Sequence, residues 1–515
     1  MSIIKINIVA NFAGRGWKAL INVAFVPLYI TLLGIEAYGL IGIFVTLTTL
    51  FTLVDLGLST TLNRELAKLS VQRDSISEMR DFVRTIEIIY WILAIFSGCI
   101  IIFLAPMIAS HWIKAGRMTH DVIRQSVMIM GLITAFNLPF AMYSGGLMGL
   151  QRQTLFNGII IITETVRGIG AVLVLWLVSP TIKVFFLWQI FIATIQTFAT
   201  AIALWMSLPR AKGSAHFRKD LLLRVWRFAA GLTGISVVVL ILTQVDKIIL
   251  SKMLTLEMFG YYTLAWTVAG GLYVLIGPVF NATFPCFSQY VALNDKNRLK
   301  EIYHKSCQLM SILILPAAII IALFATEILN IWLQNPIMVE RTHKLVTLLI
   351  IGSALNGLMN IPYALQLAYG WIRLSLYGNL IGIMLLVPMI VYLTHRYGAV
   401  GGAIAWPALN LGYFLLAIPI MHRRLLPTEK WRWYIEDVGK PLMAALLTAS
   451  FGRFLISGPM SQHVILAYLF AVFIVTLLMS ILVASHIRMS IIYKLQMAIR
   501  FPAGRANDND KSKQL

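Results

Sequence analysis

Residues 7–33 read NIVANFAGRGWKALINVAFVPLYITLL, a long apolar run interrupted by a regular series of polar side chains. These side chains follow one another at steps of three or four residues, which places them on one face of an α-helix. They are Asn7, Asn11, Arg15, Lys18 and Asn22, and we call them the polar stripe. The other faces carry apolar residues that suit lipid or neighbouring helices. We therefore predict a membrane-spanning helix over residues 7–33.

An arginine within such a helix has two interpretations. An Arg at bilayer depth costs roughly 2.5–17 kcal/mol, depending on how it is measured. Arg15 could reach back to the lipid headgroups along its flexible stem. Alternatively, the polar stripe lines a water-filled cavity, which we favour because Lys18 and Asn22 lie successively deeper. Gly14 and Gly16 beside Arg15 leave room for a second backbone or a bulky solute.

The composition indicates a membrane protein throughout. Of 515 residues, 59% are hydrophobic and only 12% are charged, whereas soluble proteins contain about 25% charged residues. The net charge of +21 could suggest nucleic-acid binding. However, Lys and Arg concentrate in short loops between apolar runs, which is typical of membrane orientation. The three cysteines are scattered and predict neither a disulfide framework nor a metal site.

At about 20 residues per span, the apolar runs predict fourteen transmembrane helices. They lie at 7–33, 38–60, 84–109, 122–147, 153–178, 182–206, 226–250, 258–285, 303–325, 342–368, 374–394, 398–421, 438–457 and 463–485. The loops after the second, sixth, eighth and twelfth helices, together with the C-terminal tail, hold most of the Lys and Arg residues. The positive-inside rule then predicts that both termini are cytoplasmic.

The chain contains an internal repeat. Residues 137–141 read NLPFA, and residues 360–364, which are 223 positions further on, read NIPYA. A second series of matches, at an offset of 221, pairs Leu33, Glu36, Tyr38 and Gly39 with Leu254, Glu257, Phe259 and Gly260. Six predicted helices separate the copies, and this even number gives both halves the same orientation. We predict six-helix lobes at 1–210 and 211–432, two further helices within 433–487 and a basic cytoplasmic tail at 488–515.

Ionisable residues inside other predicted helices are further candidates for function. Their positions are Asp55 in the second helix, Glu164 and Arg167 in the fifth, and Asp246 and Lys247 in the seventh. Glu164 and Arg167 could simply neutralise each other, and Asp246 and Lys247 could lie at the membrane interface. Alternatively, Arg167 and Lys247 bind substrate, and the carboxylates of Asp55, Glu164 and Asp246 bind a proton or sodium ion that drives transport.

Two further patterns bear on function. A polar face of the second helix consists of Thr48, Thr52, Asp55 and Ser59. The chain contains no P-loop, HExxH or GxSxG pattern, so we expect neither ATP hydrolysis nor an enzyme of those classes, and we expect no metal or organic cofactor. Every loop expected outside the cytoplasm is too short for a soluble catalytic domain.

Several stretches resemble the polysaccharide-transporter branch of the multidrug/oligosaccharidyl-lipid/polysaccharide exporter superfamily. In the first half they are NFAGRGWKAL (11–20), PLYITLLGIEAYGL (27–40) and LVDLGLSTTLNRELA (53–67). In the second half they are QVDKIILSKML (244–254), FGYYTLA (259–265) and QLAYGWIRLSLYGN (366–379). The resemblance implies an all-α fold of fourteen helices in a V-shaped, two-lobed transporter of the bacterial inner membrane.

The resemblance also implies a function. Members of this branch are flippases for undecaprenyl-pyrophosphate-linked O-antigen or exopolysaccharide repeat units, and their polysaccharide polymerases and other assembly proteins are expected partners. The family's basic lining would correspond to Arg15 and Lys18, with Arg167 and Lys247 as further candidates and Asn11 and Asn22 beside them. Three alternatives remain open: an ion-coupled multidrug exporter of the same superfamily, a membrane glycan polymerase or ligase, and a scaffold of a polysaccharide-assembly complex.

Overall fold

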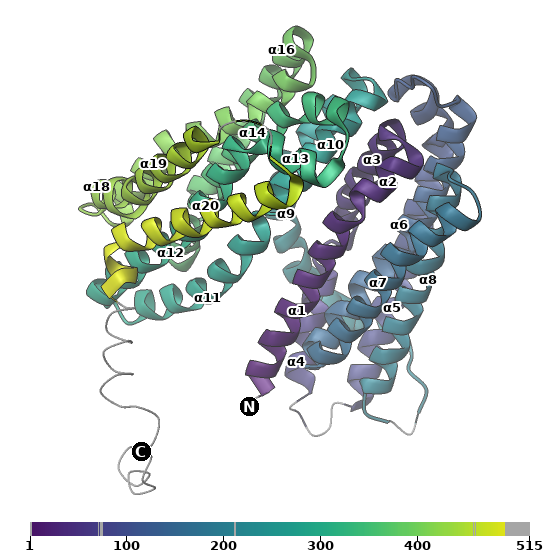
Figure 1. Cartoon of the computed structure of the whole chain (residues 1–515). Coiled ribbons are helices and arrows are strands. Elements are labelled where there is room, and N and C mark those ends of the chain that lie inside the picture. The colour runs from purple at the N-terminus through teal and green to yellow at the C-terminus, as the bar shows by residue number, and fades with distance from the viewer. Residues whose placement is uncertain are drawn as a thin grey trace, which may run out of the picture. The chain divides into compact units, whose positions relative to one another are not determined.

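A computed structural model describes residues 3–70, 72, 76–210, 213–456, 458 and 460–489 (Figure 1). Within these ranges the chain is helical and contains no β-strand. The helices of the first half are α1 (Ile3–Ala24), α2 (Val26–Leu33), α3 (Ile35–Phe51), α4 (Leu58–Leu69), α5 (Ile76–Met107), α6 (His120–Gly149), α7 (Gln153–Leu177), α8 (Ile182–Ser207) and α9 (Lys219–Met253). The later helices are α10 (Leu256–Gly270), α11 (Tyr273–Ala292), α12 (Lys296–Leu323), α13 (Ala325–Leu333), α14 (Pro336–Leu358), α15 (Asn360–Ala368), α16 (Arg373–Gly412), α17 (Ile418–Leu425), α18 (Lys430–Arg432), α19 (Lys440–Leu455) and α20 (Gln462–Val483).

Eleven helical segments of the described chain are long and apolar enough to cross a membrane, so the predicted all-α, multi-pass fold is confirmed. The predicted number of fourteen stays a prediction. One candidate, Arg373–Leu425, is a single segment of 53 residues that covers two predicted spans and bends at Gly398, where φ is +59°. The helix α19 has 16 residues and continues directly from the π-helical segment Trp433–Gly439, and this stretch is not among the eleven candidates.

The first predicted helix differs from its expected form. The structure divides residues 7–33 between α1 and α2 at Phe25. Pro27 lies in the first turn of α2, where its missing N–H is tolerated, whereas it would interrupt the hydrogen bonding of a continuous helix.

Two compact units divide the chain. Unit 1 comprises residues 1–268, 340–345 and 376–405, and unit 2 comprises 269–339, 346–375 and 406–515, as far as they are described. The lobes expected at 1–210 and 211–432 and the pair of helices within 433–487 stay predictions. From residue 490 onward the predicted basic tail lies outside the described residues.

Helices α4 to α8 form the apolar core of unit 1. Figure 1 shows α5, α6, α7 and α8 running alongside one another, and α6 packs against both α5 and α8. Small residues bring α6 close to α4. A Cβ atom at Gly145 would lie 2.6 Å from the carbonyl oxygen of Ser59, and one at Gly149 would lie 2.5 Å from that of Asn63. Tight helix contacts through glycine are typical of membrane proteins.

The two copies of the repeat meet inside unit 1. A Cβ atom at Gly39 in α3 would lie 2.2 Å from the carbonyl oxygen of Leu256, and one at Gly260 in α10 would lie 2.3 Å from that of Ile35. Each glycine also lies against the backbone nitrogen of the other. Gly39 and Gly260 are the matching positions of the two copies, so α3 and α10 cross at equivalent points.

Hydrogen bonds join loops that the sequence places on the same side of the membrane. At one end of unit 1, Glu36 accepts from the backbone N–H groups of Gly116 and Arg117. These residues belong to predicted outer loops. At the other end, Arg80 donates to the carbonyl oxygen of Pro209 and His216 donates its backbone N–H to Asp81. These residues belong to predicted inner loops. Within unit 1 the alternation of loops therefore agrees with the predicted order of the spans.

Candidate functional site

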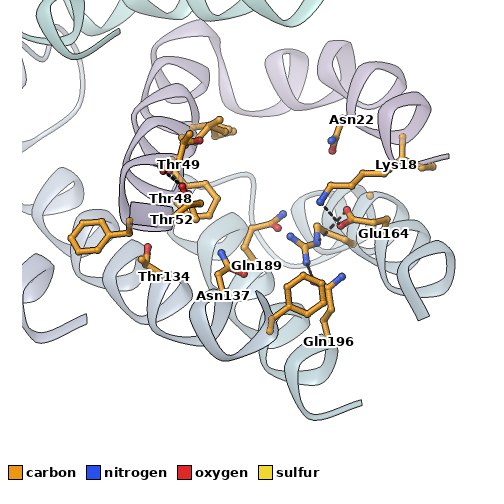
Figure 2. A pocket seen from close by; sticks show the side chains of 18 of the residues that line it. Lys18, Asn22, Thr48, Thr49, Thr52, Thr134, Asn137, Glu164, Gln189 and Gln196 are labelled. Carbon is orange, nitrogen blue, oxygen red and sulfur yellow. Dashed lines mark hydrogen bonds and ion pairs between the residues drawn. The ribbon is translucent and has the colours of Figure 1, made fainter. Parts of the chain in front are cut away.

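A cavity of about 750 Å³ opens within unit 1. Figure 2 shows Thr48, Thr49 and Thr52 on one side of it and Lys18, Asn22 and Glu164 on another, with Asn137 and Gln189 between them. The polar residues that line it are Lys18, Asn22, Tyr29, Tyr38, Thr48, Thr49, Thr52, Asp55, Ser59, Thr134, Asn137, Glu164, Arg167, Gln189, Gln196 and Thr267. The first copy of the repeated motif, residues 137–141, supplies part of this lining through Asn137, Leu138, Phe140 and Ala141.

One wall of the cavity is the polar face of the second predicted span. All four residues of that face, Thr48, Thr52, Asp55 and Ser59, line the cavity. The threonine hydroxyls are satisfied by their own helix, since Thr49 donates to the carbonyl oxygen of Val45 at 2.7 Å and Thr52 to that of Thr49 at 2.6 Å. The threonines therefore make this wall polar but uncharged. Asp55 is the charged member of the four residues.

Asp55 lies at the end of α3 in a 3₁₀ turn, Thr52–Asp55. Its carboxylate accepts hydrogen bonds from the hydroxyl of Tyr90 and, at 2.9 Å, from that of Ser59. Both donors are neutral, so the negative charge of Asp55 has no cation against it among the described residues.

Lys18, Glu164 and Arg167 form an ionic group on the opposite wall. Glu164 is buried, with 1% of its surface exposed. Its Oε1 lies 3.3 Å from Nζ of Lys18, and its Oε2 lies 3.6 Å from Nε of Arg167. Arg167 also donates from Nη2 to Oε1 of Gln196 at 2.6 Å. Gln196 in turn donates to the hydroxyl of Thr163 at 3.0 Å. We call Lys18, Glu164 and Arg167 the ionic triad.

The formal charges of the lining cancel. Lys18 and Arg167 are its cations, and Asp55 and Glu164 are its carboxylates. We expected a positively charged lining, and the structure places a buried carboxylate between the two cations. The reason is that α1 and α7 pack against each other, which brings Glu164 against Lys18 although 146 residues separate them in the chain.

The polar stripe divides along α1. Near the N-terminus its asparagines contact the start of α7: Asn11 donates to Oε1 of Gln153 at 3.0 Å, and Asn157 donates to Oδ1 of Asn11 at 2.7 Å. Arg15 is exposed and is not part of the cavity lining. Of the polar stripe, Lys18 and Asn22 line the cavity. We expected all five residues to do so, but Asn7, Asn11 and Arg15 do not.

Asp246 and Lys247 form a separate group on α9. Asp246 accepts from the hydroxyl of Tyr262 at 2.6 Å and from the indole of Trp266 at 3.0 Å. Nζ of Lys247 lies 3.5 Å from Asp246 and 4.1 Å from the centre of the Trp266 ring. Neither residue belongs to the cavity lining.

Two lining residues could have been found from their spacing. Gln189 and Gln196 lie seven residues apart in the sixth predicted span, which is two helical turns, so they share a face. We did not single them out.

Within the described part of the chain, no group of three or more His, Cys, Asp or Glu residues could hold a metal ion.

A family model described as "Polysaccharide biosynthesis protein" matches residues 31–336, more than half of the chain. The chain belongs to this family. A relative from Shigella flexneri, described as "Putative O-antigen transporter", is 22% identical over 407 residues, which cover 79% of this chain and 94% of the relative. The resemblance to polysaccharide transporters that we inferred from the sequence is thereby confirmed.

Solved structures show the same fold. The structure "Lipid II flippase MurJ, inward closed conformation" superposes with a TM-score of 0.68 at 15% identity, covering 96% of this chain and 99% of that one. An inward-facing multidrug resistance transporter of the MATE family within the MOP superfamily gives a TM-score of 0.62 at 13% identity, with 79% and 94% covered. This member of the polysaccharide biosynthesis family therefore has the MurJ/MATE-like transporter fold.

Proposed function

We propose that the protein is a flippase that moves undecaprenyl-pyrophosphate-linked oligosaccharide repeat units from the cytoplasmic to the outer leaflet, for O-antigen or exopolysaccharide synthesis. Family membership, the relative described as an O-antigen transporter and the flippase fold support this proposal. The observation that carries it is the cavity of about 750 Å³ with its amide- and hydroxyl-rich lining and its Lys18 and Arg167 cations.

The chemistry of this cavity suits such a cargo. Sugars present many hydroxyl groups, and the lining offers amide and hydroxyl partners in Asn137, Gln189 and Thr134. A pyrophosphate is a compact anion that Arg167 can hold with two parallel N–H donors and Lys18 as a point charge. The isoprenoid tail stays in lipid. No bond of the cargo needs to break, so the protein acts as a transporter and not as an enzyme.

The remaining assignments follow from this function. The protein lies in the bacterial inner membrane with both termini in the cytoplasm, and a polysaccharide polymerase and other assembly proteins receive its cargo.

Movement occurs by alternating access, and a proton or sodium ion bound at Asp55, Glu164 or Asp246 drives it. Lys18, Asn22 and Arg167 bind the cargo in the cavity. Asn11, Arg15 and Lys247 lie outside the lining, and their part in binding stays a prediction.

Deletion of the gene tests this function. The deletion strain should accumulate undecaprenyl-linked repeat units on the cytoplasmic face, because their polar headgroups cannot cross hydrocarbon unaided. Treatment of sealed inverted and right-side-out vesicles with a membrane-impermeant reagent that reacts with the glycan gives the distribution of the lipid-linked oligosaccharide across the membrane. An unchanged amount of surface glycan in the deletion strain would contradict the proposal.

Complementation of that strain tests the cavity itself. Lys18→Ala should reduce export about tenfold or more, since a hydrogen bond to a charged group contributes about 1.5–3 kcal/mol. Lys183→Ala is the comparison, because it removes an exposed cation at the start of α8, outside the lining, and we expect export within about twofold of wild type. Both proteins must be present in the membrane at equal amounts. Full export by Lys18→Ala would refute the proposed role of Lys18 in binding the cargo.

A second candidate function is an ion-coupled multidrug exporter. The carboxylates of Asp55 and Glu164 in the lining favour it, because cationic drugs need negative partners. A panel of cationic drugs distinguishes the two: deletion should leave drug susceptibility unchanged if the cargo is a lipid-linked glycan. Increased susceptibility with normal surface glycan would support the exporter instead.

A further inference from the structure

The ionic triad contains one carboxylate between two cations at the wall of the cavity. Glu164 is almost fully buried, whereas the Lys18 side chain is 50% exposed and that of Arg167 is 21% exposed. A buried carboxylate needs a cation to offset its loss of water. The two cations need it less, since both are partly exposed and line the cavity.

The two cations are held to different degrees. Arg167 is fixed from two sides, by Glu164 and by its 2.6 Å hydrogen bond to Gln196. Lys18 has Glu164 as its charged partner, at 3.3 Å, and the described residues give its ammonium group no second contact. Lys18 can therefore turn from Glu164 toward another anion in the cavity without breaking any other interaction.

We propose that Glu164 is an internal competitor for the phosphate of the cargo. This proposal rests on the proposed flippase function and adds a residue that sets affinity and release. In the empty cavity, Glu164 occupies Lys18 and Arg167. The incoming pyrophosphate displaces it from Lys18 first and then shares Arg167. When the cargo leaves, Glu164 recovers both cations.

This competition has a physical purpose in a transport cycle. Two uncompensated cations would hold a dianion tightly, and most of the added affinity would appear as slower dissociation. A transporter needs its cargo to leave as well as to bind. An internal carboxylate weakens the loaded state and stabilises the empty one, so that the free energies of the two are closer together. Slow release is then avoided.

A purely structural role for Glu164 would be to fasten α1 to α7. Other contacts already do this: Trp17 donates to the hydroxyl of Thr165 at 2.7 Å, and Asn157 donates to Asn11 at 2.7 Å. Gly14 also lets the Asn157 side chain approach α1 closely. The packing of α1 on α7 therefore does not depend on Glu164, and a Glu164→Gln variant is expected to fold.

The experiment measures binding and transport of undecaprenyl pyrophosphate, used as the probe lipid, with full-length protein. We expect Glu164→Gln to bind the probe more tightly than wild type, by up to about fivefold, since a partly exposed ion pair contributes up to about 1 kcal/mol. We also expect its turnover in reconstituted vesicles to fall. Glu164→Asp, which keeps the charge, should behave like wild type in both measurements. Weaker or unchanged binding by Glu164→Gln would overturn the proposal, because a structural carboxylate would give that result.

Two further variants make the interpretation specific. Glu436→Gln is a matched control, because Glu436 also lies between an arginine and a lysine, Arg432 at 3.1 Å and Lys440 at 3.9 Å, but outside the cavity. It should leave probe binding unchanged, and tighter binding by this variant would overturn the proposal by showing a general effect of net charge. Lys18→Gln tests the proposed function separately. If Lys18→Gln binds the probe as wild type does, the cavity is not the phosphate site and the flippase assignment of these residues fails. If Lys18→Gln weakens binding but Glu164→Gln does not strengthen it, only the competitor role fails.

Discussion

At the scale of single residues, glycines separate into those that the fold needs and those that it does not. A Cβ atom at Gly39 or Gly260 would lie within 2.3 Å of a backbone carbonyl oxygen of the facing helix. Backbone cannot move aside as a flexible side chain can, so the two helices would have to separate. A Cβ atom at Gly16, on an exposed part of α1, would meet nothing within 4 Å.

This difference gives a prediction about stability. Gly39→Ala should destabilise the protein by about 1–3 kcal/mol, the usual effect of overpacking a close contact. Gly16→Ala should leave stability unchanged or raise it by up to about 1 kcal/mol, because alanine is the better helix former. Thermal unfolding of both purified variants in detergent measures the effect. Equal melting temperatures for the two would show that the α3–α10 crossing is not tight.

Residue by residue, the sequence predicted which side chains are polar within the spans but not what they contact. The Thr48–Ser59 face could be predicted because helical spacing puts its members on one side. The contact of Lys18 with Glu164 could not, because it depends on which helices pack together. Arg15 shows the same limit: its place on the polar stripe was correct, but the stripe continues past the end of the cavity.

At the scale of elements, α19 shows how a short helix is fixed in unit 2. In the π-helical segment Trp433–Gly439, which leads directly into α19, Asp437 accepts a hydrogen bond from the ring of His304 in α12 at 2.5 Å. At the end of α19, Arg453 pairs with Glu327 of α13. His304 and Glu327 lie at opposite ends of the region formed by α12 and α13, so α19 connects the predicted inner loops to a predicted outer one. This placement is in keeping with the thirteenth predicted span, 438–457.

The residue that precedes α18, Glu429, is a buried carboxylate whose titration can be tested. Burial raises the pKa of Glu429, but hydrogen bonds from Lys300, Thr428 and His304 outweigh it and lower the pKa to about 2. Because this value lies below that of the unfolded chain, the charge of Glu429 stabilises the fold at neutral pH. That contribution is lost as the pH falls from about 4.5 toward 2.

We therefore expect Glu429→Gln to lower the melting temperature by an amount that is constant between about pH 8 and pH 5 and shrinks at lower pH. Glu436→Gln, which removes a more exposed carboxylate seven residues later, should have a much smaller effect throughout. Melting curves of wild type and both variants across this pH range measure the difference. A destabilisation that grows on acidification would contradict the assigned direction.

At the scale of the whole molecule, the alternation of loops is the property that sequence predicts best. It depends on where charges lie between apolar runs, and hydrogen bonds within unit 1 join loops of the same predicted side. The number of spans is harder to predict, because length and hydropathy are ambiguous where a helix is short, as α19 is, or where two helices continue through a bend, as at Gly398.

Cysteine labelling in intact cells tests this topology. In a variant whose three natural cysteines are replaced, Thr181→Cys and Ser461→Cys should react with a membrane-impermeant maleimide. Ser214→Cys and Met489→Cys should react only after the membrane is opened, because they lie on the predicted cytoplasmic side. All four positions are in the described chain. Protection of Ser461→Cys in intact cells would exclude the thirteenth span and reduce the number to fewer than fourteen.

The crossing of α3 and α10 at Gly39 and Gly260 also bears on how such a chain could arise. If one gene of half the present length was duplicated and fused, these two glycines descend from a single ancestral position. Before the fusion, that position would have touched its own counterpart in a second identical subunit. The crossing then preserves, inside one polypeptide, the contact of an ancient homodimer whose subunits faced the same way across the membrane.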